Sequence, residues 1–271
     1  MSKPMVICEH LTKRFDLSDP WLVRKLTGTP KRELVAVDAV SFEIPRGKTY
    51  ALVGESGSGK STIARMVVGL MQPDAGGVTI DGHNLNTSQD AASLQAVRQT
   101  LQMVFQSPYS SLNPRWRVND ILLEPIRAFD LISDEHDQNR RVRELLDQVG
   151  LSPSDAAKYP HEFSGGQRQR ISIARGLASN PSFMVCDEPT SALDVSVQAQ
   201  VLNLLKELQR ELGLTYLFIS HDMAVVRVMA HHIGVLKHGR LVEANAAETL
   251  FRNPQERYTK TLIDATPKVM V

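Results

Sequence analysis

The clearest structural signal in this chain is the stretch YALVGESGSGKS, residues 50–61. It starts with four apolar residues in a row, which is typical of a parallel strand covered by helices on both sides. The remaining residues match the pattern GxxxxGK[ST], and we expect a helix to begin near Lys60. A buried strand, a glycine-rich loop and a helix in this order predict a loop whose backbone N–H groups converge on an anion.

The side chains of this loop are suited to a triphosphate and a magnesium ion. Lys60 supplies a mobile positive charge for the β- and γ-phosphates, and Ser61 offers a hydroxyl to Mg²⁺. An isolated match can be a flexible loop, but the flanking strand and helix favour a phosphate site. The loop alone identifies a P-loop NTPase and nothing finer. The residues expected to contact the nucleotide here are Gly54, Glu55, Ser56, Gly57, Ser58, Gly59, Lys60, Ser61 and Thr62.

A second apolar stretch, Phe183–Cys186, ends in the acids Asp187 and Glu188. An acid directly after a buried strand can hold Mg²⁺ beside the phosphate loop, usually through water, and this is the role expected of Asp187. Glu188 is then well placed to polarise the water that attacks the γ-phosphate. The alternative is that Glu188 only caps the turn that begins at Pro189.

Further apolar stretches alternate with helical patterns. Tyr216–Ile219 reads as another buried strand, and Val195–Leu212 carries an apolar helix face that Gly213 ends. Such alternation predicts an α/β sheet built from crossover units.

Other regions depart from this alternation. Residues 36–44 and 78–81 read as short antiparallel strands, and a hairpin is expected around residues 237–240. Residues 107–163 read as an inserted helical lobe, punctuated by Pro108, Pro114, Pro125, Pro153 and Pro160. The predicted fold class is α/β, a P-loop NTPase with a mainly parallel core sheet, an antiparallel β subdomain and an inserted helical subdomain.

Composition narrows the possible classes of protein. A net charge of +1 over 271 residues argues against a broad nucleic-acid-binding face, so no nucleic-acid partner is expected. The basic run from Lys13 to Arg32 reads as a solvated loop. Cys8 and Cys186 are the two cysteines, far apart, which suggests neither disulfides nor a zinc site and fits a reducing cytosol. No stretch approaches the roughly 20 apolar residues that cross a bilayer, and the first residues lack the core of a secretory signal.

Several short motifs carry a family resemblance. Ser164–Arg168, SGGQR, resembles the LSGGQ signature of ABC ATPases, with Phe163 in place of the usual Leu. Ser191–Asp194 resembles the D-loop of that family, Gln106 its Q-loop and His221 its switch histidine. The motifs stand in the order and approximate spacing of the family, and the resemblance covers nearly the whole chain.

The resemblance implies ATP and Mg²⁺ as cofactors and two cassettes stacked head-to-tail, as a homodimer or a heterodimer. Each ATP then lies between the phosphate loop of one chain and the signature of the other. Glu188 and His221 are the implied catalytic residues, and Phe15 matches the aromatic residue that stacks on adenine, although Leu11 and Phe15 could equally be core residues. The implied metal contacts are Ser61, Gln106 and Asp187, and the further nucleotide contacts are Ser164, Gly165, Gly166, Gln167 and Asp194. An ordinary helix N-cap would explain Ser164 but leaves the two glycines and Gln167 without a reason.

The family also implies a domain organisation and partners. We expect one nucleotide-binding domain, with a RecA-like core at about 1–106 and 167–240, a helical subdomain at about 107–166 and a C-terminal tail at about 241–271. The expected partners are transmembrane permease subunits, a second ABC ATPase subunit and, indirectly, a periplasmic solute-binding protein. The expected location is the cytoplasmic face of the inner membrane, as a peripheral subunit.

Several stretches resemble the peptide-importer branch of these ATPases: residues 106–115 (QSPYSSLNPR), Tyr159–Phe163, Asn253–Pro254, Tyr258–Thr259 and residues 265–267. They lie in the helical lobe and the tail, where contact with the coupling helix of a membrane subunit is expected. Two rival functions are a soluble ABC ATPase of DNA repair, chromosome organisation or translation, and a non-hydrolysing interaction module. Soluble ABC ATPases generally carry coiled coils, zinc modules or two cassettes. A non-hydrolysing interaction module is expected to lose Glu188 or His221.

Overall fold

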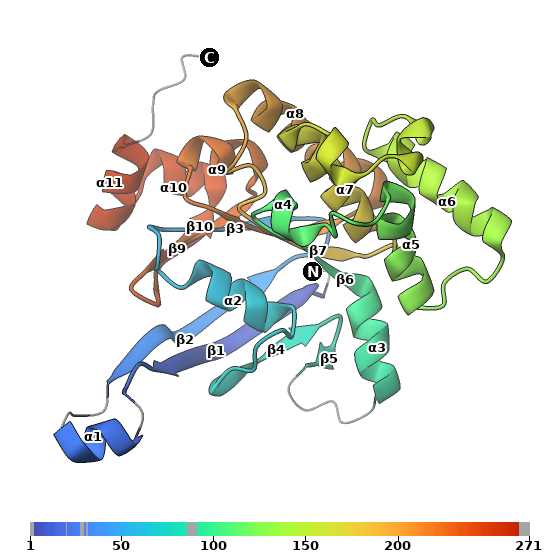
Figure 1. Ribbon diagram of the computed structural model, residues 1–271. Coiled ribbons are helices and arrows are strands. Elements are labelled where there is room, and N and C mark those ends of the chain that lie inside the picture. The colour runs from blue at the N-terminus through green and yellow to red at the C-terminus, as the bar shows by residue number, and fades with distance from the viewer. Residues whose placement is uncertain (1–2, 20, 28–29, 31, 86–90, 266–271) are drawn as a thin grey trace.

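The computed structural model describes residues 3–19, 21–27, 30, 32–85 and 91–265. Within them the strands form two sheets, one of six strands and one of four (Figure 1). Among the described helices, none combines the length and the apolar character that a membrane span requires.

The six-stranded sheet has the order β10-β9-β3-β8-β7-β6. Its strands are β3 (Thr49–Val53), β6 (Leu101–Val104), β7 (Phe183–Asp187), β8 (Thr215–Ser220), β9 (His232–Lys237) and β10 (Arg240–Ala246). All neighbouring pairs are parallel except the hairpin of β9 and β10. The buried strands and the hairpin expected from the sequence are confirmed.

The four-stranded sheet is antiparallel and has the order β2-β1-β4-β5. Its strands are β1 (Val6–Asp16), β2 (Glu33–Ile44), β4 (Ala75–Ile80) and β5 (His83–Asn84), and α1 (Trp21–Thr27) lies between β1 and β2. The two strands expected at 36–44 and 78–81 are present but do not pair with each other. β1 lies between them and pairs with both in an irregular register, so its residues do not keep the regular alternation that predicts a strand.

Helices cover both faces of the six-stranded sheet. α2 (Lys60–Val67) packs between it and the antiparallel sheet, while α7 (Gly165–Leu177) and α8 (Val195–Leu212) pack on the opposite face (Figure 1). α8 has the bounds expected from the sequence, and Gly213 ends it in the left-handed conformation at φ 67°. Outside the inserted segment the structure also has α3 (Ala91–Thr100), α9 (Met223–Met229), α10 (Ala247–Arg252) and α11 (Arg257–Asp264).

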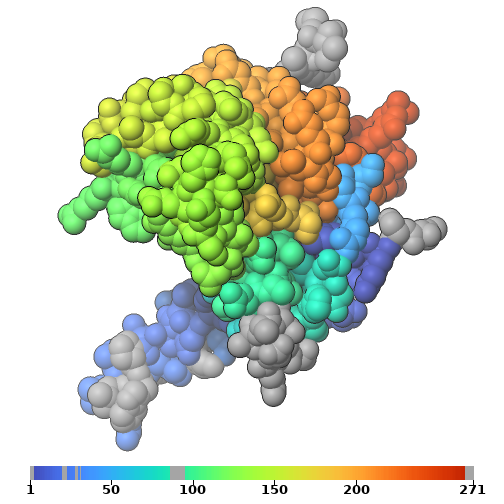
Figure 2. Space-filling model, turned by 90° about the vertical axis from the view of Figure 1, so that its right-hand side faces the viewer, coloured from blue at the N-terminus to red at the C-terminus, as the bar shows by residue number. Residues whose placement is uncertain are grey.

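The inserted segment is helical, as expected. It contains α4 (Pro108–Ser111), α5 (Val118–Ala128), α6 (Glu135–Gln148) and the 3-10 helices η1 (Pro153–Ala157) and η2 (Pro160–Glu162). Figure 2 shows these residues, in green to yellow-green, as one mass beside the core.

One proline of this segment lies in a structural context that differs from the expectation. Pro108, Pro153 and Pro160 start short helices, where the missing N–H costs nothing. Pro125 was expected to interrupt structure, but it lies inside α5. The apolar face of α5 is buried in the core, and this packing offsets the roughly 3 kcal/mol that an internal proline costs.

Candidate functional site

The glycine-rich loop between β3 and α2 lies at one wall of a cavity of about 870 Å³. Two of its glycines have no room for a side chain. A Cβ on Gly54 would lie 2.2 Å from the carbonyl oxygen of Leu236, and one on Gly59 would lie 2.4 Å from that of Ala36. The loop is therefore held in shape by close approach of β9 and β2, with its backbone exposed to the cavity.

Lys60 is buried at the base of the loop. Its Nζ donates hydrogen bonds to the carbonyl oxygens of Gly54 and Glu55, at 2.7 and 2.8 Å. Burial lowers the pKa of Lys60, while the nearby Glu188 and Asp187 raise it in part. A desolvated ammonium with a cavity beside it is suited to bind a phosphate group.

The predicted metal ligands Ser61 and Asp187 are adjacent. The Ser61 hydroxyl donates to Oδ1 of Asp187 at 3.1 Å, across the gap between α2 and the end of β7. Burial raises the pKa of Asp187, and the Ser61 hydrogen bond lowers it only in part. A hydroxyl and a carboxylate in this arrangement fit the preference of Mg²⁺ for hard oxygen ligands.

Two predicted residues, Gln106 and His221, converge on the carboxylate of a third, Glu188. Oε2 of Glu188 accepts a hydrogen bond from Nε2 of Gln106 at 3.0 Å and lies 3.2 Å from Nδ1 of His221. In the turn after β7, the backbone carbonyl of Glu188 accepts hydrogen bonds from the N–H and the hydroxyl of Ser191. The Glu188 side chain does not make these bonds. The capping alternative therefore does not account for the carboxylate. The φ of 47° at Glu188 is unusual for a residue with a side chain and aims this group at the cavity rim.

Most of the predicted contacts line this one cavity: Phe15, Gly54, Glu55, Ser56, Gly57, Gly59, Lys60, Ser61, Thr62, Gln106, Glu188 and His221. Ser58 and Asp187 are buried behind that lining. Leu11 is a core residue. Phe15 is half-buried and lines the cavity, so of the two residues it is the one placed to contact a nucleotide there.

The signature residues lie elsewhere in the part of the chain that the structure describes. Ser164 caps α7 through a capping box: its Oγ accepts from the N–H of Gln167 at 3.3 Å, and Oε1 of Gln167 accepts from the N–H of Ser164 at 3.0 Å. A Cβ on Gly166 would lie 2.2 Å from Cγ1 of Val197. Gln167 therefore completes the cap of α7, and Gly166 lets α7 pack closely against α8. The sequence alone suggested neither role. Gly165 lies beside them in the first turn of the helix and is half-buried.

Asp194 likewise starts a helix. Its Oδ1 accepts from the N–H of Val197 at 2.9 Å and from the hydroxyl of Ser196 at 2.7 Å, and these bonds lower its pKa. Like the signature, Asp194 is not among the described residues that line the cavity.

Several cavity residues were missed by the sequence analysis. They are Leu34, Val35 and Ala36 of β2, His238 and Gly239 of the β9–β10 turn, and Leu262 of α11. Leu34 pairs with Phe15 across β1 and β2, so apolar side chains gather at one end of the cavity. The hairpin at 237–240 was expected, but its position beside the phosphate loop follows only from the pairing of β9 with β3.

Tyr258 was expected at a contact with a membrane subunit. Its hydroxyl accepts a hydrogen bond from the N–H of Glu55, at 3.1 Å, and the expected contact with a membrane subunit stays a prediction. Residues 266 and 267 of the branch-specific tail stretch lie outside the described residues.

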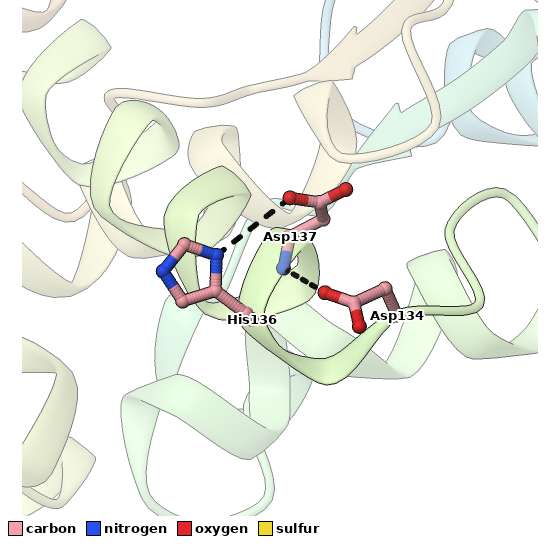
Figure 3. A group of neighbouring side chains, drawn as sticks. All are labelled: Asp134, His136 and Asp137. Atoms are coloured by element: carbon pink, nitrogen blue, oxygen red, sulfur yellow. Dashed lines mark hydrogen bonds and ion pairs between the residues drawn. The ribbon is translucent and has the colours of Figure 1, made fainter.

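One further group of oxygen and nitrogen donors lies at the start of α6 (Figure 3). Asp134 caps the helix by accepting from the N–H of Asp137 at 2.9 Å, and Nδ1 of His136 is 3.8 Å from Oδ1 of Asp137. The capping bond accounts for this grouping, and its three residues are not part of the cavity lining.

The sequence of this chain is similar to those of ABC transporter ATPases. A family model described as ABC transporter matches residues 37–191. The oligopeptide transport ATP-binding protein OppF of Bacillus subtilis (strain 168) is 50% identical over 239 residues, covering 88% of this chain and 78% of that protein. The glutathione import ATP-binding protein GsiA of Escherichia coli (strain K12) is 46% identical over 265 residues, which are 98% of this chain but 41% of that longer protein.

Solved structures give the same result. A dimeric, post-hydrolysis state of the ATP-binding cassette MJ0796, bound to ADP and Pi, has a TM-score of 0.77 and 29% identity over 90% of this chain and 99% of that one. The structure of cbiO1 from Clostridium perfringens, part of the transporter complex cbiONQ, has a TM-score of 0.76 and 25% identity over 93% of this chain and 92% of that one. The chain thus belongs to the ABC transporter family, as one of its ATP-binding and ATP-hydrolysing subunits.

Proposed function

We propose that this chain energises the import of di- or oligopeptides by hydrolysing Mg–ATP as the peripheral subunit of a membrane transporter. The cargo follows from the relatives, since OppF and the putative peptide import ATP-binding protein of Brucella abortus (strain 2308) are named for peptide transport. The observation that carries the ATPase role is the convergence of Lys60, the Ser61–Asp187 pair and Glu188 around one cavity.

The proposed chemistry assigns a task to each group. Lys60 and the loop N–H groups bind the β- and γ-phosphates. Ser61 and Asp187, together with Gln106, would hold Mg²⁺, which when bound would neutralise charge on the phosphates. Glu188 polarises the attacking water, and Gln106 and His221 fix its carboxylate through the contacts at 3.0 and 3.2 Å.

The active unit in this proposal is a pair of cassettes. Ser164 to Gln167 and Asp194 lie away from the chain's own cavity and complete the site of a second subunit. The start of α7, a helix N-terminus with Ser164 and Gly165, is suited to a phosphate group supplied by that partner. Support comes from solved relatives described as dimeric.

We further propose that residues 107–166 form the lobe that contacts transmembrane permease subunits, beside a core at about 1–106 and 167–240 and a tail at about 241–271. α7 spans the boundary at 166 and therefore links the signature mechanically to the core. The complex lies at the cytoplasmic face of the inner membrane and takes its cargo from a periplasmic solute-binding protein.

An ATPase assay on the purified chain with and without its co-purifying membrane proteins tests this proposal. Glu188→Gln is expected to lower turnover by roughly 10²-fold or more while leaving nucleotide binding intact, because it removes the proton acceptor and retains the shape. Turnover at the wild-type rate would contradict the role of Glu188. Recovery of the chain from detergent-solubilised membranes without permease subunits would favour a soluble ABC ATPase.

A further inference from the structure

The C-terminal helix α11 is anchored firmly to the core. The carboxylate of Glu243, on β10, accepts hydrogen bonds from the N–H groups of Gln255 and Glu256, at 2.9 and 3.1 Å, directly before the helix. Thr259 is fully buried, and apolar side chains of the helix pack against the cluster that contains Ala51 and Val53 of β3. Since β3 leads into the phosphate loop, this packing sets where α11 lies relative to the loop.

Two side chains of α11 reach the nucleotide cavity. The Tyr258 hydroxyl accepts from the N–H of Glu55 at 3.1 Å, and Leu262 forms part of the cavity wall. The Lys237 ammonium lies 4.8 Å from the centre of the Tyr258 ring, which fixes the ring from the side of β9. The Tyr258 hydroxyl is neutral near neutral pH, as in any tyrosine, and burial raises its pKa further.

The peptide between Gly54 and Glu55 is thereby held at both of its polar atoms. Its carbonyl oxygen accepts from Lys60 at 2.7 Å, and its N–H donates to Tyr258. An ammonium has three donors, and two of those of Lys60 are used by the carbonyls of Gly54 and Glu55. A triphosphate competes for these donors, and Tyr258 then becomes the remaining side-chain contact to this peptide among the described residues.

We propose that Tyr258 is a positioning residue that holds the first peptide of the phosphate loop in its binding orientation when Lys60 turns to the phosphates. The proposal rests on the proposed ATP-binding role of this loop. A loop that is already ordered loses less conformational entropy on binding, so Tyr258 strengthens nucleotide binding without touching the nucleotide itself. The tail therefore contributes to the nucleotide site and is more than a surface for the membrane partner.

Tyr258→Phe tests this inference because it keeps the ring and its contact with Lys237 and removes only the acceptor. Measured by calorimetric titration of the full chain with Mg–ATP, the dissociation constant is expected to rise about three- to fivefold, the effect of one modest hydrogen bond. The thermal midpoint without nucleotide is expected to stay unchanged, because Lys60 still holds the peptide. In an ATPase assay the variant raises KM and leaves kcat close to that of the wild type.

Tyr50→Phe is the matched control, because it also removes a tyrosine hydroxyl, in this case a buried one that has no hydrogen-bond partner among the described residues. It is expected to bind Mg–ATP like the wild type. Lys60→Ala tests the proposed function separately and should abolish detectable binding. If Lys60→Ala abolishes binding but Tyr258→Phe equals Tyr50→Phe, the inference about Tyr258 is wrong and the proposed function stands. A nucleotide-free midpoint that falls in Tyr258→Phe would also overturn the inference, since the hydroxyl would then serve the fold itself.

Discussion

At the scale of single residues, the buried environment of Asp187 disfavours the charged form of its carboxyl group. It is 7% exposed, and burial raises its pKa above the ordinary value of an aspartate, although Ser61 counteracts this in part. Because the pKa is higher in the folded chain than in the unfolded one, the folded chain binds more protons between the two values. The free energy of unfolding therefore falls as the pH rises through that window.

Asp187→Asn should for this reason stabilise the chain in the absence of nucleotide and metal. At neutral pH we expect the thermal midpoint to rise by about 2–4 °C, as roughly 1 kcal/mol produces in a chain of this size. Below the ordinary pKa range of aspartate the gain should disappear, because the wild-type carboxyl is then also neutral. The same variant should lose Mg²⁺-dependent ATPase activity. A lower midpoint at neutral pH would show that the carboxylate stabilises the empty site.

At the scale of elements, the packing of α7 on α8 depends on the absence of a side chain at Gly166. A Cβ on Gly166 would meet Cγ1 of Val197 at 2.2 Å, whereas one on the adjacent Gly165 would lie 3.5 Å from Cδ2 of Leu193, an ordinary contact. The two glycines of the signature therefore differ in their structural role.

Gly166→Ala should lower the free energy of unfolding by about 1–3 kcal/mol, because the inserted methyl group forces the helices apart. Gly165→Ala is the control and should leave it close to that of the wild type. Urea denaturation of the nucleotide-free chain measures both. Adding Val197→Ala to Gly166→Ala should recover part of the loss. Equal stability of the two single variants would contradict this account of the helix interface.

At the scale of the whole molecule, the cavity is formed without the chain's own signature residues. The chain's own signature helix does not line the cavity, and the His221 side chain is 58% exposed beside Glu188. A nucleotide that contacts two chains favours their association, and loss of the γ-phosphate removes that preference.

A chain with Glu188→Gln should consequently form a dimer when Mg–ATP is added and remain monomeric with ADP. Size-exclusion chromatography with light scattering measures this directly. Adding Lys60→Ala to the same chain should abolish the dimer, because the nucleotide no longer binds. A dimer of equal extent without nucleotide would contradict the head-to-tail arrangement around ATP.

Local features of the chain were predictable from the order of residues. The phosphate loop, the acids at the end of β7, the bounds of α8 and the β9–β10 hairpin depend on hydrogen bonds and periodicities within a few residues, so neighbouring residues carry the signal. Family motifs added Gln106 and His221, which the fold brings to the carboxylate of Glu188.

Contacts between distant segments were decided by the tertiary structure. The N–H of Glu55 and the hydroxyl of Tyr258 are separated by 203 positions, and only the pairing of β9 with β3 and the packing of α11 bring them together. The packing reason for Gly166 and the continuation of α5 through Pro125 likewise depend on surfaces that other segments supply. Short-range patterns encode which groups the chain offers, whereas burial and sheet topology determine which of those groups meet.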